Sequence, residues 1–354
     1  MWKIGDLELD GRVILGPMAG FTSRGYREFM EPFGVAASVT EMTSDMGIIY
    51  GTERTEESFV SFKSERPTGL QLFGHDPECL AKAAVRALEL NPNIAFFDVN
   101  MGCPVPKVSR NGSGCVLMKT PKVCGDIVRH MKRAVDLPVT VKVRLGWTMA
   151  TVNFREVIEE TVSAGADAVT LHPRTRDERY VGFPHYDLVD GFAKEISVPL
   201  IISGNIYTVE DARRAMEVTG ADGVMVARGG VGNPFLITQI ESYFRGEPVP
   251  ENPTISQQVH WCIELADRLI EEKGEVEGMA KMRSMAPKFV AGCDGCREYR
   301  YRLATESIDR DAMIDILMEV DHVLGDQRVR SPPSQICTHR EEYGNIKCQI
   351  TDEE

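Results

Sequence analysis

Eight short apolar runs recur along the first two thirds of the chain, and segments with helical spacing of apolar and polar positions separate them. The runs cover residues 13–15, 37–40, 69–72, 96–99, 139–143, 168–171, 199–202 and 223–226. Each run is almost continuously apolar, which is the pattern of a parallel strand buried on both faces. The pattern therefore predicts an α/β fold with eight parallel strands.

The segments between the runs carry residues that start and end helices. Asp76 precedes Pro77, Thr120 precedes Pro121, and Gly220 follows a helical segment. A capping side chain followed by Pro is typical of a helix N-terminus, and Gly of a helix C-terminus. Eight strand–helix units in about 240 residues predict a (β/α)8 TIM barrel. A doubly wound open sheet is the alternative, but it usually begins with a Gly-rich phosphate turn, which this sequence lacks.

The pattern changes after residue 245. Residues 246–253 have the sequence Gly-Glu-Pro-Val-Pro-Glu-Asn-Pro, which is typical of a linker. Only helical spacing follows, over residues 255–272, 276–290, 293–304 and 310–324. We therefore expect a catalytic barrel over 1–245, a linker over 246–254, a small all-α helical domain over 255–325 and a C-terminal tail over 326–354.

The fourth run ends in residues 98–104, Asp-Val-Asn-Met-Gly-Cys-Pro, and a loop with Gly112 and Gly114 follows. A barrel places its active site at the carboxyl ends of its strands. On its own, Cys103 is more often a small buried residue than a reactive thiol. Seven of the eight predicted strand ends carry polar, charged or Gly-rich groups, and this convergence favours a functional role for Cys103.

Composition narrows the class of protein. The nine cysteines are an odd number spread over 354 residues, which argues against a disulfide framework and for a reducing compartment. Because we find no leader segment and no apolar run of membrane-spanning length, we expect a cytoplasmic protein. The net charge of −13 argues against a generic nucleic-acid binder but is compatible with a local basic face.

The chemistry of the strand ends predicts a flavin mononucleotide (FMN) site. The Gly-containing turns after strands seven and eight, together with Arg228, suit a phosphate group. Lys142, at the barrel mouth, needs an anionic or electron-rich partner, which a reduced flavin ring would supply. Gln71 can both donate to and accept from the edge of a planar heterocycle.

Seven segments carry a resemblance to a known family. They are residues 15–20, 71–74, 98–104, 141–144, 172–175, 203–206 and 226–229. With these segments in this order, the chain resembles the tRNA-dihydrouridine synthase family, flavoenzymes that reduce uridine in tRNA to 5,6-dihydrouridine. The helical region after residue 250 agrees with the family in position and type.

The resemblance implies a set of flavin contacts and a proton donor. The flavin contacts are Pro17, Met18, Ala19, Gln71, Lys142, His172, Ser203, Gly204, Asn205, Ala227 and Arg228. Ala227 stands where the family often has Gly, so the contact expected there is through the backbone. The implied proton donor is Cys103. The implied reductant is NADPH, although the sequence has no nicotinamide fingerprint that would choose NADPH over NADH.

The reaction requires a hydride at C6 of uracil and a proton at C5. A thiol with a reference pKa of about 8.5 is mostly protonated at neutral pH and suits the second task. The uridine must leave the RNA stack to reach a barrel mouth. We expect Asn100 to hold the uracil edge, and Arg174 and Arg176 to contact the base or nearby phosphates.

We expect tRNA to span two basic regions, and we expect neither a membrane nor an obligate protein partner. The regions are the helical-domain residues Lys281, Arg283, Lys288, Arg297, Arg300 and Arg302, and a strip of Lys107, Arg110, Lys119 and Lys122. Two other functions remain open. They are an FMN barrel oxidoreductase that acts on a free pyrimidine-type molecule, and a non-catalytic tRNA-binding or chaperone protein.

Several candidate residues also have structural interpretations. Lys142 could pair with Glu41, and His172 could be a satisfied core histidine. We expect Glu41 and Asp98 to bond to other strand ends rather than to act in acid–base chemistry. A Cys-x-x-Cys pair has zinc-like spacing, but no matched second pair follows it, so we expect no metal. The cysteines and histidine concerned are Cys293, Cys296, Cys337, His339 and Cys348.

Overall fold

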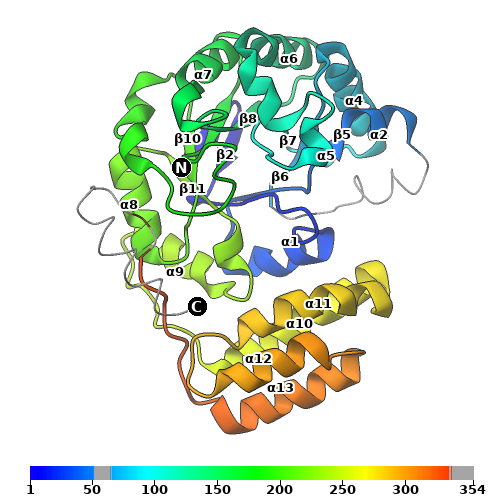
Figure 1. Ribbon diagram of the computed structural model, residues 1–354, viewed down its shortest axis with the longest axis vertical. Helices are drawn as coiled ribbons and strands as arrows, with labels where there is room; N and C mark the ends of the chain where they lie inside the picture. Colours follow the sequence, from blue (N-terminus) through cyan, green and yellow to red (C-terminus); the bar gives the residue numbers. More distant parts are fainter. Residues whose placement is uncertain (52–63, 65, 335, 337–354) are drawn as a thin grey trace.

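The computed structural model of the chain describes residues 1–51, 64, 66–334 and 336 (Figure 1). Within these residues, eight parallel strands form a closed barrel because β4 pairs with both β3 and β6. The strands are β3 (Val13–Leu15), β4 (Ala37–Val39), β6 (Thr68–Phe73), β7 (Phe96–Asn100), β8 (Val139–Arg144), β9 (Ala168–His172), β10 (Leu200–Ser203) and β11 (Gly223–Val226). The predicted TIM barrel is confirmed.

The strand register brings predicted site residues to the same level. Gln71 on β6 lies opposite Asp98 on β7, and Asn100 on β7 lies opposite Lys142 on β8. Because side chains alternate between the two faces of a strand, Asp98 and Asn100 point to the same face of the sheet. The register therefore places a ladder of polar groups near the carboxyl ends of neighbouring strands.

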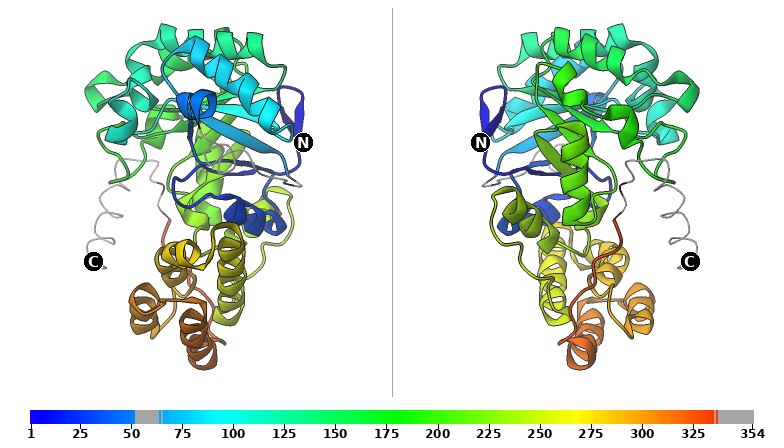
Figure 2. Two further views of the ribbon diagram at one scale, coloured as in Figure 1. Left: turned by 90° about the vertical axis from the view of Figure 1, so that its right-hand side faces the viewer. Right: turned by 90° about the vertical axis from the view of Figure 1, so that its left-hand side faces the viewer.

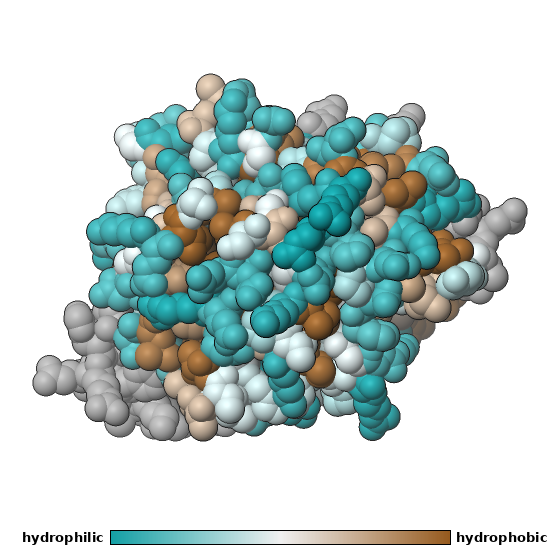
Figure 3. All heavy atoms as spheres, turned by 90° about the horizontal axis from the view of Figure 1, so that it is seen from above, coloured by the Kyte–Doolittle hydropathy of each residue, from teal (hydrophilic) through white to brown (hydrophobic). Residues whose placement is uncertain are grey.

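Helices surround the barrel on its outer side (Figures 1 and 2). They are α1 (Arg24–Met30), α2 (Asp45–Tyr50), α4 (Pro77–Leu90), α5 (Pro106–Ser109), α6 (Pro121–Ala134), α7 (Phe154–Ser163), α8 (Val209–Thr219) and α9 (Phe235–Phe244). The predicted helix starts are confirmed: Asp76 accepts from the backbone N–H of Cys79, and Pro121 lies in the first turn of α6. The helices present mainly hydrophilic residues outward on the side opposite the C-terminal helices (Figure 3).

A hairpin that we did not predict closes the amino end of the barrel. It consists of β1 (Trp2–Ile4) and β2 (Leu7–Leu9), which pair antiparallel. Trp2 donates from its indole nitrogen to the carbonyl oxygen of Gly11 at 2.8 Å. Ile4 and Leu9 are fully buried and pack in one cluster with residues of the barrel interior. A further short strand, β5 (Thr43–Ser44), pairs with β6.

Four helices follow the barrel, as the sequence predicts. They are α10 (Ile255–Lys273), α11 (Glu275–Phe289), α12 (Cys296–Thr305) and α13 (Arg310–Leu324), and they pack together beyond α1 and α9 (Figure 1). The third begins at Cys296 instead of the predicted residue 293. The reason is local: Gly292 and Gly295 adopt left-handed backbone angles, φ 81° and 79°, which do not continue a helix.

The four-helix bundle, α10 to α13, shares a core with the barrel. The ring of Phe29 lies 6.3 Å from that of Phe289, and the ring of Phe33 lies 5.2 Å from that of Trp261. The carboxylate of Glu272 accepts from the hydroxyl of Ser23 at 2.7 Å. The division of the chain at residues 246–254 stays a prediction, and these contacts show how tightly the two parts are joined.

After α13 the chain returns to the barrel. Ser334 donates from its hydroxyl to Asp211 on α8 at 2.7 Å, and the side chain of Ile336 is fully buried. None of the helices in the described ranges has both the length and the apolar character that crossing a membrane requires.

Candidate active site

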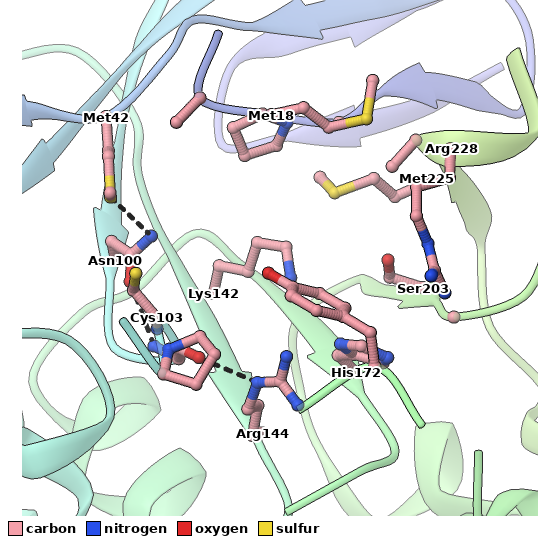
Figure 4. Close-up of a pocket in the computed structure, with 18 of the residues that line it drawn as sticks. Met18, Met42, Asn100, Cys103, Lys142, Arg144, His172, Ser203, Met225 and Arg228 are labelled. Carbon is pink, nitrogen blue, oxygen red and sulfur yellow. Dashed lines mark hydrogen bonds between the residues drawn. The ribbon is translucent and has the colours of Figure 1, made fainter. Parts of the chain in front are cut away.

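A cavity of about 390 Å³ opens at the carboxyl ends of the barrel strands (Figure 4). Its lining includes Pro17, Met18, Ala19, Gln71, Asn100, Cys103, Lys142, His172, Ser203, Gly204, Asn205, Ala227 and Arg228. Figure 4 shows Asn100 and Cys103 on one side, Ser203 and Arg228 on the other, and Lys142 between them. The structure thus brings together every predicted site residue except Arg174 and Arg176.

Arg174 and Arg176 do not line the cavity. Arg174 is fully buried and donates to His172 Nε2 at 3.1 Å, to Asn205 Oδ1 at 3.0 Å and to the carbonyl oxygen of Gly182. Its guanidinium therefore holds two cavity residues in place. The guanidinium of Arg176 lies 4.5 Å from the centre of the Trp147 ring, and neither residue lines the cavity.

Burial and the charges of four nearby cations keep His172 neutral, and three of these cations, Lys142, Arg144 and Arg228, line the cavity. Burial, followed by the charges of Arg144, Lys142, Arg174 and Arg228, holds the pKa of His172 well below its usual value. Because Arg174 can only donate, His172 Nε2 accepts, and the proton of the neutral ring is on Nδ1. Burial also lowers the pKa of Lys142 to about 8. A cavity with this charge suits an anionic ligand.

Cys103 lies in a loop that is folded tightly back on itself. The backbone N–H of Cys115 donates to the carbonyl oxygen of Cys103 at 3.2 Å. Gly114 has φ 63°, and a Cβ at this position would lie 2.9 Å from the same oxygen, so the close approach requires glycine. Burial raises the pKa of the Cys103 thiol, which therefore stays protonated at neutral pH.

Asn100 connects this loop to the barrel wall. Its amide oxygen accepts from the backbone N–H of Cys103 at 2.9 Å and of Gly102 at 3.2 Å. Its amide nitrogen donates to Gln71 Oε1 at 2.9 Å and approaches the sulfur of Met42 at 3.9 Å. Both ends of the Asn100 side chain thus bond to protein groups at the cavity wall.

The opposite wall has the form of an anion cradle. Gly204 and Asn205 adopt left-handed backbone angles, φ 123° and 53°, and a Cβ at Gly204 would lie 2.9 Å from the His172 ring. A Cβ at Gly229 would collide with the carbonyl oxygen of Ile206, so two loops meet closely there. Arg228 donates to Asn205 Oδ1 at 3.2 Å. Such Gly-rich turns allow a phosphate to approach the backbone.

The structure adds lining residues that we did not select. They are Tyr180 and Tyr207, Met42 and Met225, and Arg144. Tyr180 is 53% exposed, and its ring centre lies 5.3 Å from Arg144 and 5.2 Å from Arg228. Arg144 directly follows the predicted strand 139–143, whereas no local sequence pattern sets the path of the loop that carries Tyr180.

Contacts of Lys281, Lys288 and Arg302 locate three of the six predicted basic residues of the bundle. Lys281 donates to the carbonyl oxygen of Gly20 at 3.0 Å, and Lys288 Nζ lies 5.2 Å from the ring of Phe21, which lines the cavity. Arg302 instead pairs with Glu319 at 2.6 Å and with Glu306 at 3.3 Å. Lys281 and Lys288 thus lie near the cavity mouth, whereas carboxylates compensate the charge of Arg302.

The described part of the chain contains no group of three or more His, Cys, Asp or Glu residues that could hold a metal ion. Cys293 is buried and Cys296 is partly exposed, and both are free thiols. Cys337, His339 and Cys348 lie outside the described residues.

Comparison with known proteins adds independent information. Residues 14–321 match the family model described as dihydrouridine synthase (Dus). The chain is 33% identical over 299 residues to tRNA-dihydrouridine synthase B of Pseudomonas aeruginosa, covering 84% of this chain and 89% of that protein. It is 35% identical over 274 residues to probable tRNA-dihydrouridine synthase 1 of Synechocystis sp., covering 77% and 76%.

A solved structure shows similarity in fold alone. The histamine dehydrogenase from Rhizobium sp. 4-9 matches with a TM-score of 0.50 at 15% identity. The match covers 73% of this chain and 50% of that chain.

Proposed function

Because the chain belongs to the dihydrouridine synthase family, we propose that it uses a bound FMN to reduce specific uridines of tRNA to 5,6-dihydrouridine. The observation that carries this proposal is the cavity, which has a protonated thiol on one wall and three cations, Lys142, Arg144 and Arg228, in its lining. When bound, the flavin supplies a hydride to C6 of the uracil. The other roles belong to side chains of this chain.

The residues around the cavity fit FMN. The cradle of Ser203, Gly204 and Asn205 with Arg228 would hold the phosphate. In the described residues no carboxylate forms an ion pair with Lys142, so an electron-rich ring edge would complete its environment. Neutral His172 would offer a hydrogen bond without adding charge. Pro17, Met18, Ala19 and Ala227 would enclose the ring and its side chain.

Cys103 is the proposed proton donor to C5 of the uracil. Its buried thiol carries a proton at neutral pH, and Asn100 and Cys115 fix the backbone on both sides of it. A positioned acid of this kind contributes roughly 10²- to 10⁴-fold to a proton transfer. Arg174 is fully buried, so it would act through His172 and Asn205 instead of touching the base.

The substrate is a base in RNA, which must leave its stack to enter the cavity. Lys281 and Lys288 near the mouth, and Arg176 beside Trp147, would bind the phosphates around it. NADPH or NADH would reduce the flavin again between turnovers.

The proposal is tested by mapping dihydrouridine by mass spectrometry in tRNA from cells with and without this protein. A uridine whose mass falls by two units when the protein is lost supports the proposal, and unchanged tRNA contradicts it. Purified protein should show flavin absorption, since colourless protein would favour a binding function. Turnover of free uridine as fast as of tRNA would favour an oxidoreductase that acts on small molecules.

A further inference from the structure

Asp98 is a buried carboxylate that the proposed reaction does not use. It lies on β7, is 1% exposed and does not line the cavity. Its two oxygens accept from Thr140 Oγ1 and from Gln71 Nε2, both at 2.6 Å. Burial raises its pKa to about 6, against the stabilising effect of both hydrogen bonds and of Lys142. Burying an ionisable carboxylate destabilises the folded protein, and such groups are often found where they serve the function of a site.

The hydrogen bonds that leave Asp98 have a fixed direction. An ionised carboxylate only accepts, so Gln71 must turn its Nε2 toward Asp98 and its Oε1 toward Asn100. Asn100 must then present its Nδ2 to Gln71, which leaves Oδ1 for the backbone N–H groups of Gly102 and Cys103. If either amide were reversed, two donors or two acceptors would face each other.

The two amides lie between groups of fixed polarity: Asp98 only accepts, and the backbone N–H groups of Gly102 and Cys103 only donate. Each amide by itself has a donor and an acceptor end of nearly equal shape. Asp98 is the member of this hydrogen-bonded series that lacks a donor, so it fixes the orientation of Gln71, and Gln71 Oε1 then holds Asn100 with its Oδ1 toward the loop. The parallel register supports the geometry, since Gln71 lies directly opposite Asp98 on the neighbouring strand.

We propose that Asp98 is a positioning residue that fixes, through Gln71 and Asn100, the backbone of the loop that presents the Cys103 thiol. Its consequence for turnover depends on the proposed function, but its effect on the loop can be measured without RNA. When Asp98 is neutralised, the amides of Gln71 and Asn100 can reverse, and Asn100 Nδ2 then faces the N–H groups from which Oδ1 previously accepted.

The experiment measures two properties of the purified full-length protein. The first is hydrogen exchange of the backbone amides of Gly102 and Cys103. The second is the rate at which iodoacetamide alkylates Cys103, read by peptide mass spectrometry against the partly exposed Cys296 as an internal reference. Asp98→Asn should speed exchange at these amides by about tenfold, the scale of one lost hydrogen bond, and should alter Cys103 alkylation while Cys296 is unchanged.

The decisive variant exchanges the carboxylate and the amide between positions 98 and 71. In Gln71→Glu/Asp98→Asn, the carboxylate introduced at position 71 accepts from the amide introduced at position 98 and from Asn100, so Asn100 must again direct its oxygen to the loop. We expect this double variant to restore protection and alkylation to within about threefold of the original protein, a difference smaller than one hydrogen bond. Glu241→Gln neutralises a buried carboxylate at the other end of the barrel and should change neither property.

Wild-type exchange in Asp98→Asn, or a double variant no better than the single one, would overturn the positioning role. These results are independent of the proposed function. If the loop responds as expected but tRNA never gains dihydrouridine, the positioning role stands and the proposed function fails.

Discussion

At the amino ends of the barrel strands, carboxylates bond to backbone amides, whereas near the carboxyl ends the buried Asp98 bonds to side chains. Glu241 accepts from the N–H groups of Arg12 and Val13, both at 2.6 Å, where β3 begins. Asp167 accepts from the N–H of Val139 at 2.7 Å, where β8 begins. A backbone amide has one orientation, so these bonds stabilise the starts of the strands but do not select between alternative orientations of another group.

Side-chain amides differ because they have two orientations, and a bond to one of them selects between the two. If Asp98 has the positioning role that we propose, a carboxylate stabilises the fold at one end of the barrel and orients the site near the other. We expect substitutions at the amino end to change stability, and substitutions at the carboxyl end to change the reaction.

The largest expected effect is the loss of turnover when the Cys103 thiol is removed. Cys103→Ala should lower turnover of tRNA uridine by roughly 10²- to 10⁴-fold, because the proton at C5 loses its positioned donor. Flavin absorption and tRNA affinity should stay unchanged. Single-turnover mass spectrometry of tRNA measures the rate, and Cys296→Ala is the matched control. Turnover at the original rate would falsify the proton-donor role.

A truncation at the amino end should affect stability instead. Glu241→Ala leaves two buried N–H groups at the start of β3 without their acceptor, which should cost about 2–5 kcal/mol of unfolding free energy. Urea denaturation measures this cost. Activity per folded molecule should not change. A loss of activity in fully folded protein would show that the two ends are not separate.

Neutralising Asp98 should lower the rate of turnover without lowering stability, which is the opposite of the result expected for Glu241→Ala. The pKa of Asp98 is raised from 3.8 to about 6, so between these values the folded state binds the proton more readily than the unfolded state, and stability falls as pH rises. Because one pKa unit corresponds to about 1.4 kcal/mol, ionised Asp98 costs about 3 kcal/mol above pH 6.

Asp98→Asn should therefore be at least as stable as the original protein at pH 8, by up to about 3 kcal/mol, with a gain that shrinks as pH falls from 6 to 4. Turnover should nevertheless be lower. Thermal unfolding at several pH values, with kcat and KM, checks both statements. A variant that is clearly less stable at pH 8 would assign Asp98 to the fold alone.

The smallest expected effect concerns RNA contact. Lys288→Glu, near the cavity mouth, should weaken tRNA binding several-fold and reduce the slope of log K against log salt by about one. Lys3→Glu, in the hairpin at the amino end, should leave both quantities unchanged. Filter binding over a salt series measures them. Equal losses of tRNA affinity in the two variants would mean that tRNA does not bind preferentially at the cavity end of the barrel.

The barrel could be predicted because its strands are buried on both faces, so each leaves a continuous apolar run. The cavity could be predicted because parallel strands bring their carboxyl ends together, which places Gln71, Asn100 and Lys142 on one face. The amino-terminal hairpin was missed because strands of three residues are too short to show alternation.

The positions of residues along the strands did not predict the direction in which long side chains point. Position alone suggested that Arg174 faces the substrate. Its direction depends on acceptors that come from distant segments, Gly182 and Asn205. Tyr180 reaches the cavity through a loop whose path depends on bonds from Arg144 to the carbonyl oxygens of Thr175 and Arg179. No local pattern encodes such contacts.

The return of the chain from α13 to the barrel has a mechanical consequence. The bundle is joined to the barrel through α10, where Glu272 accepts from the hydroxyl of Ser23, and again by the chain after α13, where Ser334 bonds to Asp211. Figure 2 shows the bundle on one side of the barrel and the segment after α13 running back toward the barrel. Two connections restrict rotation of the bundle against the barrel more than one connection would. If the protein acts on tRNA as we propose, a bundle fixed in this way would make distance the criterion of selection: the nucleotide that enters the cavity would be the one at a constant distance from the RNA segment that the bundle binds.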